Sequence, residues 1–237
     1  MTARLLLLCC IAAMFAVSCD DRADGLKGFN DPPSIVLQAQ RGGAETDLLI
    51  DSVKLSNPAF SYMPFIIRVE DLNKNIKHVL MDVVAGSGYL QYREDSTRDT
   101  VRIIDDKGIY RFVPEHTGNM TVRFVVTDYF GEADSAELRL YVFNNLPPVA
   151  ALAVTYLGTA DQYEYLFDAS GSFDNDRSFG GVVSKYVFTV NNVRIAETVT
   201  PAIPYIFPGP GSYTCKVQVT DSDGAVSKEV TQQIQVP

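Results

Sequence analysis

TVRFVVTDYFG, residues 121–131, decides the fold of this chain, because it recurs as TCKVQVTDSDG at residues 214–224. Apolar and polar residues alternate in both copies, which is the period of a β-strand with one buried face. Each copy then places an Asp and, three residues later, a Gly, which are residues typical of a tight turn. Two copies of one strand-and-turn unit, starting at residues 121 and 214, predict two similar domains in tandem.

The rest of the chain after its first 33 residues also has the pattern of short strands. Runs rich in β-branched residues occur at 35–37, 65–69, 79–84 and 101–104. Turn residues separate these runs, and no window has the apolar repeat of a helix. The sequence therefore predicts an all-β protein with two tandem immunoglobulin-like β-sandwiches, residues 34–145 and 146–237, divided at Pro147-Pro148.

The alternation in the second copy predicts the environment of Cys215. Tyr213, Cys215, Val217 and Val219 fall on one face of the strand, which we expect to pack on the opposing sheet. Cys215 is then a small buried hydrophobic residue. A reactive thiol is the alternative, but no basic residue accompanies Cys215 on that face.

Residues 147–237 resemble a PKD domain, an immunoglobulin-like module. The matching stretches follow the order of that family, and they are 147–150, 167–174, 205–214 and 219–224. The Tyr-x-Trp-x-Phe-Gly-Asp-Gly hallmark of the family is replaced by Tyr186-Val187-Phe188-Thr189-Val190-Asn191-Asn192-Val193, in which Phe188 can fill the core position of the Trp. The resemblance implies a spacer, or a module that binds protein or carbohydrate.

The N-terminal segment has the layout of a secretory signal. Arg4 precedes the apolar run Leu5–Val17, which is too short to span a membrane. Ala16-Val17-Ser18-Cys19 resembles the bacterial lipobox, which implies a signal peptide over 1–18, lipid on Cys19, and a tether over 19–33. The alternative is an ordinary signal peptide in which Cys19 is incidental. The layout of 34–144 resembles small Bacteroidetes lipoproteins, including one encoded with conjugative-transfer genes.

Charge and cysteine content limit the classes of partner and the kind of stabilisation. The net charge of −9 disfavours nucleic acid and anionic membrane surfaces as partners. Cys9 and Cys10 belong to the predicted leader and Cys19 carries the predicted lipid, so Cys215 is the only remaining thiol. We therefore expect no intramolecular disulfide, and stability that comes from the apolar cores.

Asp174-Asn175-Asp176 is the candidate metal site, with calcium as the only cofactor considered. Calcium prefers hard oxygens from carboxylates, amides and carbonyls. The resemblance implies that some PKD domains bind calcium with acidic residues at this turn and an Asn near the domain start, which is Asn145 here. The alternative is a plain turn without cofactor, because Asp and Asn are also common turn residues.

Tyr163, Tyr165 and Phe167 alternate on one predicted strand face. An exposed row of aromatic rings could stack on sugar rings, whereas the same spacing also describes a core face. We expect the core, with Tyr163 near the strand end as the candidate ligand-binding residue.

No motif in the sequence predicts catalysis. His78 and His116 are the two histidines, and no nucleophile elbow, Cys–His pair or zinc-binding helix motif occurs. We expect a non-enzymatic lipoprotein, anchored in the outer membrane by Cys19, whose sandwiches serve protein interaction, adhesion or envelope assembly. The alternatives are a glycan-binding accessory lipoprotein of a polysaccharide-uptake system, and a lipoprotein subunit of a conjugation or secretion apparatus.

Overall fold

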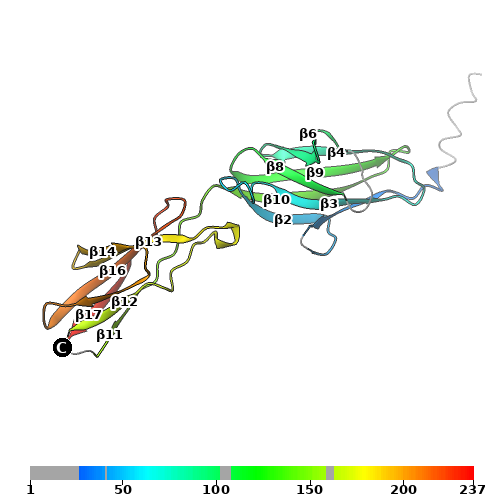
Figure 1. Cartoon of the computed structure of the whole chain (residues 1–237). Coiled ribbons are helices and arrows are strands. Elements are labelled where there is room, and N and C mark those ends of the chain that lie inside the picture. Colours follow the sequence, from blue (N-terminus) through cyan, green and yellow to red (C-terminus); the bar gives the residue numbers. More distant parts are fainter. Residues whose placement is uncertain (1–26, 41, 102–107, 159–162) are drawn as a thin grey trace, which may run out of the picture. The chain divides into compact units, whose positions relative to one another are not determined.

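The computed structural model describes residues 27–40, 42–101, 108–158 and 163–237, so the predicted signal peptide and Cys19 lie outside the described residues (Figure 1). The chain divides into two compact units. Unit 1 holds the described residues up to Val53 and Tyr62–Val142, and unit 2 holds Lys54–Ser61 and Phe143–Pro237. Within the described ranges, no helix has the length and hydropathy to cross a bilayer.

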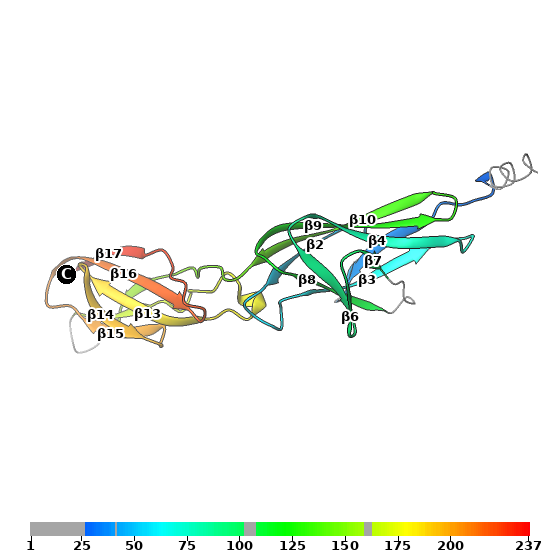
Figure 2. The same cartoon turned by 90° about the horizontal axis from the view of Figure 1, so that it is seen from above.

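Unit 1 is a β-sandwich of two sheets, with strand orders β1-β3-β8-β5-β6 and β2-β10-β9-β4-β7 (Figure 2). The strands are β1 Ser34–Ala39, β2 Leu48–Lys54, β3 Met63–Glu70, β4 Ile76–Ala85, β5 Gly88–Tyr92, β6 Asp95–Thr97, β7 Thr100–Val101, β8 Ile109–Pro114, β9 Gly118–Asp128 and β10 Ala133–Phe143. Alternate residues of the long strands are buried, as the period of two requires. Phe65 of β3 meets Phe124 of β9 across the core, with ring centroids 5.7 Å apart.

Unit 2 is a second sandwich, with strand orders β11-β12-β15 and β14-β13-β16-β17. Its elements are β11 Ala153–Tyr156, β12 Glu164–Asp168, the 3-10 helix η1 Arg177–Phe179, β13 Val183–Val190, β14 Val193–Thr198, β15 Ala202–Ile206, β16 Gly211–Asp221 and β17 Val230–Val236. Phe167 of β12 and Phe188 of β13 are fully buried, and their ring centroids lie 6.1 Å apart. Phe188 thus takes the predicted core position, and the β13–β14 turn uses positive φ at Asn191 and Asn192.

The internal repeat is confirmed as the β9–β10 and β16–β17 hairpins. In each turn, the carboxylate of the repeated Asp accepts backbone hydrogen bonds from the residues two and four positions later. The four bonds are Phe130 N to Asp128 at 2.8 Å, Glu132 N to Asp128 at 2.9 Å, Asp223 N to Asp221 at 2.9 Å and Ala225 N to Asp221 at 2.8 Å. Gly131 and Gly224 follow with φ of +86° and +92°, where glycine has no steric penalty.

Cys215 is a core residue, as the alternation predicts. Its side chain is fully buried, and burial raises the pKa of its thiol to about 11. The thiol is therefore neutral and inaccessible at physiological pH.

Replacing Cys215 by Ser is expected to lower the free energy of unfolding of unit 2 by about 1–3 kcal/mol, because the hydroxyl is buried in an apolar core. Thermal and urea denaturation of both proteins measure the difference. The wild-type thiol should also resist a thiol reagent until the protein unfolds. A Cys215→Ser protein that unfolds like the wild type would contradict the assignment, and so would rapid labelling of the native protein.

Candidate functional site

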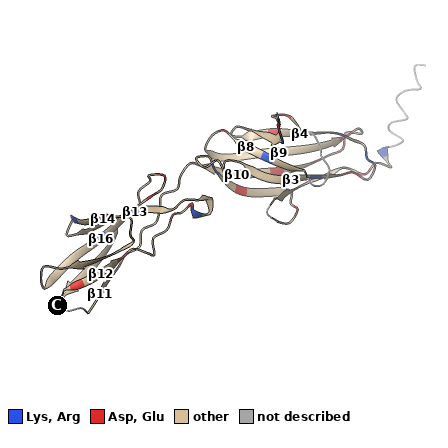
Figure 3. Ribbon diagram, viewed as in Figure 1, with Lys and Arg blue, Asp and Glu red and all other residues tan. Residues whose placement is uncertain are grey.

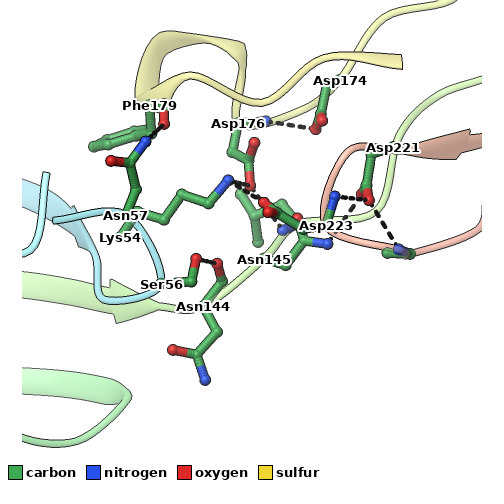
Figure 4. Close-up of polar contacts among 12 residues, drawn as sticks. Lys54, Ser56, Asn57, Asn144, Asn145, Asp174, Asp176, Phe179, Asp221 and Asp223 are labelled. Atoms are coloured by element: carbon green, nitrogen blue, oxygen red, sulfur yellow. Dashed lines mark hydrogen bonds and ion pairs between the residues drawn. The ribbon is translucent and has the colours of Figure 1, made fainter. Parts of the chain in front are cut away.

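A largely buried cluster of acidic side chains, the acidic pocket, lies at one end of unit 2 (Figure 4). Asp174 and Asp176 come from the turn before η1, and Asp221 and Asp223 come from the turn between β16 and β17. Lys54 reaches into the same pocket. The side chains of Asp174, Asp176 and Asp221 are almost completely buried, with 2%, 0% and 2% of the residue exposed.

Hydrogen bonds hold the entry segment of the second sandwich against this pocket. Asn145 Nδ2 donates to Asp221 Oδ2 at 3.0 Å, and the Leu146 amide donates to Asp176 Oδ2 at 3.1 Å. The Asp176 amide donates to Asp174 Oδ1 at 3.2 Å, which closes the turn. The two acidic turns are thereby joined through residues 145–146.

Three buried oxygens of the pocket accept no hydrogen bond: Asp174 Oδ2, Asp176 Oδ1 and Asn145 Oδ1. Two of them face the Cα of Gly181. A Cβ built on Gly181 would lie 1.7 Å from Asp176 Oδ1 and 2.6 Å from Asp174 Oδ2. Unpaired buried oxygens are costly, so a group that donates or coordinates here would stabilise the pocket.

Lys54 supplies the positive charge of the pocket. Its Nζ lies 3.0 Å from Asp176 Oδ2 and 2.5 Å from Asp223 Oδ2, and its side chain is 3% exposed. Burial alone would lower the pKa of Lys54, but the hydrogen bonds to Asp223 and Asp176 outweigh this effect and raise the pKa. The lysine is therefore charged at physiological pH and pairs with the carboxylates of Asp176 and Asp223.

The predicted calcium residues do not all enter the pocket. Asp174, Asp176 and Asn145 are brought together there. Asn175 is exposed, and its Nδ2 donates to the Pro147 carbonyl at 2.7 Å.

The sequence analysis did not assign three residues to this site, namely Lys54, Asp221 and Asp223. Lys54 and Asp223 are 169 residues apart in the chain, and no local pattern connects them. Asp221 was assigned to a turn alone. The Asn-x-Pro-Pro pattern, which occurs at both 30–33 and 145–148, could have indicated the part played by the asparagines.

Unit 1 has a counterpart of this arrangement. Asn30 Nδ2 donates to Asp128 Oδ2 at 2.6 Å, as Asn145 does to Asp221. The Asp31 amide donates to Asn73 Oδ1 at 2.7 Å, as the Leu146 amide does to Asp176. The Asn73 amide in turn donates to Asp71 Oδ1 at 2.8 Å.

The two arrangements differ in charge and in hydrogen bonding. Asn73 is neutral where unit 2 has Asp176. Asn30 Oδ1 accepts a bond from Asn75 Nδ2 at 2.7 Å, whereas Asn145 Oδ1 accepts none. The same arrangement therefore occurs in both units, but in unit 2 it has an additional acidic side chain and an amide oxygen that accepts no hydrogen bond.

A divalent cation would depend on the amide of Asn145 as well as on carboxylates. Among the described residues, no group of three or more His, Cys, Asp or Glu side chains is arranged to hold a metal. The unpaired oxygens of Asp174, Asp176 and Asn145 are nevertheless hard ligands of the kind that calcium prefers. The residues present fit calcium chemically, with Lys54 beside them.

Replacing Asp174 by Asn is expected to stabilise unit 2 by about 1 kcal/mol at neutral pH in the presence of EGTA. Burial raises the pKa of Asp174, and the carboxylates of Asp176 and Asp221 raise it further, against the lowering effect of the Asp176 amide. A raised pKa means that the native state binds the proton more readily than the unfolded chain. Wild-type stability therefore gains as the pH falls towards and through the raised pKa, and the advantage of the variant shrinks.

If the pocket binds calcium, the wild type should become more stable than Asp174→Asn in its presence, since the substitution removes a charged ligand. Urea denaturation at several pH values, with EGTA and with calcium, measures both effects. A variant that is less stable than the wild type in EGTA at neutral pH would contradict the expectation.

The aromatic row of β12 is turned towards the core. Tyr165 and Phe167 are buried, and Tyr163 is partly buried and packs against the same core cluster. Tyr156 on β11 is 53% exposed, and its ring centroid lies 5.3 Å from that of Tyr165.

The comparisons with known proteins concern the fold. No protein-family model and no curated protein sequence matches the chain. Similar solved structures include the PKD1 domain of Vibrio anguillarum Epp, which is 25% identical over 40% of this chain and 100% of that domain, with a TM-score of 0.30. The PKD1 domain from the Vibrio cholerae metalloprotease PrtV is 23% identical over 38% of this chain and 98% of that one, with a TM-score of 0.30.

Other similar structures cover both units. The fibronectin(III)-like modules of Clostridium thermocellum CbhA are 13% identical over 84% of this chain and 93% of theirs, with a TM-score of 0.33. These likenesses agree with the β-sandwich architecture described above.

Proposed function

We propose that this chain is a non-enzymatic lipoprotein of the cell envelope that presents its sandwiches to a protein partner. The lipid on Cys19 would anchor it to the outer membrane. The observation that supports a protein partner is the character of the exposed apolar side chains of unit 2. Three of them are the aliphatic residues Val193, Val199 and Ile206, which are 67%, 78% and 52% exposed.

These three residues belong to the edge strands β14 and β15 and the turn between them. An edge strand has unpaired backbone groups that can pair with another chain, and exposed aliphatic side chains add apolar contact area. Acidic and basic residues are interspersed along the strands of both units, a pattern that supports a protein partner rather than nucleic acid (Figure 3).

Capture from envelope extract tests this proposal. The bait is the chain from residue 20 onward, and its variant carries Val193→Ser, Val199→Ser and Ile206→Ser. Val226→Ser, on the β16–β17 turn, is the matched control because Val226 is 49% exposed. We expect one stoichiometric partner with the wild type and the control, and at least a tenfold loss with the triple variant. A partner retained equally by all three baits would exclude the β14–β15 edge.

Lipid attachment has its own test. Radiolabelled palmitate should enter the wild type and not the Cys19→Ala variant. Label that persists in the variant would reject the lipoprotein assignment.

A glycan-binding accessory lipoprotein is the second candidate, and exposed Tyr156 beside Tyr165 is the observation that favours it. Tyr163, which directly precedes β12 and is partly buried, was the candidate predicted from sequence. Saturable binding on a glycan array that is lost in Tyr156→Ala or Tyr163→Ala would favour this function over a protein partner. A role as a subunit of a conjugation or secretion apparatus would appear in the capture experiment as a partner from that apparatus. Turnover of a polysaccharide or peptide would reject all three.

A further inference from the structure

The acidic pocket of unit 2 contains a cation that belongs to the chain itself. The ammonium of Lys54 pairs with Asp176 and Asp223, while Asp174 Oδ2 and Asp176 Oδ1 remain unpaired on the side of Gly181. Asp176 therefore has one oxygen, Oδ2, on the Lys54 ammonium and the Leu146 amide, and one unpaired oxygen, Oδ1, packed against Gly181. Any second cation at the unpaired oxygens would share this carboxylate with Lys54.

Lys54 is the first residue of a short segment, Lys54–Ser61, that the structure groups with unit 2. The Leu55 amide donates to the Phe143 carbonyl at 2.8 Å, and Asn57 Nδ2 donates to the Phe179 carbonyl at 3.1 Å. The rings of Phe60 and Phe179 meet edge to face at 5.7 Å. Lys54 is the only charged residue of this segment, so its ion pairs are the part of the attachment that a cation can weaken.

We propose that Lys54 is a tethered counter-ion, and that a divalent cation and the Lys54 ammonium compete for the acidic pocket of unit 2. Binding of the metal at Asp174, Asp176 and Asn145 would loosen the Lys54–Ser61 segment.

The sign of this coupling follows from charge. Two cations that share the Asp176 carboxylate in a buried pocket repel each other strongly, because the effective dielectric constant there is low. Removing the ammonium should therefore strengthen metal binding, and by reciprocity the metal must weaken the attachment of Lys54 by the same factor. The pocket can attract the metal even with the lysine in place, since Asp174 and Asp221 add acidic side chains to the two that pair with Lys54.

In the described part of unit 1, the counterpart of this arrangement is held by hydrogen bonds from Asn30 to Asp128 and from Asp31 to Asn73. The residue equivalent to Asp176 is Asn73. Its neutral side-chain amide accepts a hydrogen bond from the Asp31 backbone amide, as Asp176 does from the Leu146 amide. Asp176 thus has a carboxylate where unit 1 has the neutral amide of Asn73, and Lys54 pairs with that carboxylate.

The test compares calcium binding by the full chain, in detergent, for the wild type, Lys54→Met and Lys54→Arg. Met keeps the length of an apolar stem and removes the charge, whereas Arg keeps the charge. We expect the calcium dissociation constant of Lys54→Met to be about tenfold lower than that of the wild type, and that of Lys54→Arg to be within about threefold. Titration calorimetry measures all three, and circular dichroism confirms that each is folded.

Hydrogen exchange of the wild type tests the reciprocal effect without any substitution. Saturating calcium should speed exchange at the Leu55 amide about tenfold, and should leave the Phe124 amide in the core of unit 1 unchanged. A Lys54→Met protein that binds calcium no more tightly than the wild type would overturn the proposal. So would slower exchange at Leu55 in calcium, or the absence of calcium binding in all three proteins.

Discussion

The Asp221→Ala substitution is expected to lower the free energy of unfolding of unit 2 by about 3 kcal/mol. Its carboxylate accepts the amides of Asp223 and Ala225 and the Nδ2 of Asn145, and the residue is 2% exposed. Hydrogen bonds to a charged group contribute about 1.5–3 kcal/mol each, and donors left without partners in a buried turn add to the loss. Urea denaturation followed by a probe in each unit measures the effect.

Asp128→Ala is the matched substitution in the other copy of the repeat. Asp128 accepts the amides of Phe130 and Glu132, so its loss should destabilise unit 1 and leave the transition of unit 2 unchanged. Burial would raise the pKa of Asp128, but the bonds from Asn30 and the turn amides outweigh it and lower the pKa. This contribution is therefore present at neutral pH and is lost as the pH falls through the lowered pKa. Equal destabilisation of both units by either variant would show that the two turns are not independent.

The fold could be predicted because its signals are local. The alternation along β9 and β16 and the Asp and Gly of the following turns are visible within 11 residues, and burial of one strand face follows directly from them. Cys215 and Phe188 were placed correctly for the same reason. The grouping of Lys54–Ser61 with unit 2 was not visible, because it depends on contacts with Phe143 and Phe179 far along the chain.

The site could be predicted only in part, for the same physical reason. Asp174 and Asp176 were selected because oxygen-rich side chains at one turn are a local pattern. The same pattern included Asn175, whose neighbours turn it towards Pro147 instead. Sequence reports which side chains carry charge but not which of them are buried together. No local pattern therefore points to Lys54, although it supplies the positive charge that faces Asp176 and Asp223.

Replacing Gly181 by Ala is expected to lower the free energy of unfolding of unit 2 by about 3 kcal/mol. The added Cβ would overlap Asp176 Oδ1 at 1.7 Å and press on Asp174 Oδ2 at 2.6 Å. Asp176 cannot move away easily, because its other oxygen, Oδ2, accepts a hydrogen bond from the Leu146 amide and pairs with Lys54 Nζ. Overpacking a constrained buried site costs about 1–3 kcal/mol, and the size of this overlap places it at the upper end.

Gly209→Ala provides the control for this prediction, because a Cβ at Gly209 would meet no atom within 4 Å. Its effect on the unfolding free energy should stay within about 0.5 kcal/mol. A double-mutant cycle then identifies the cause of the Gly181→Ala effect. In an Asp176→Ala background the larger overlap, with Asp176 Oδ1, no longer exists and only that with Asp174 remains, so the cost of Gly181→Ala should fall by at least half. If the full cost persists in that background, the loss arises from the backbone of the 180–182 turn, and the close approach of Gly181 to the acidic pocket is not its cause.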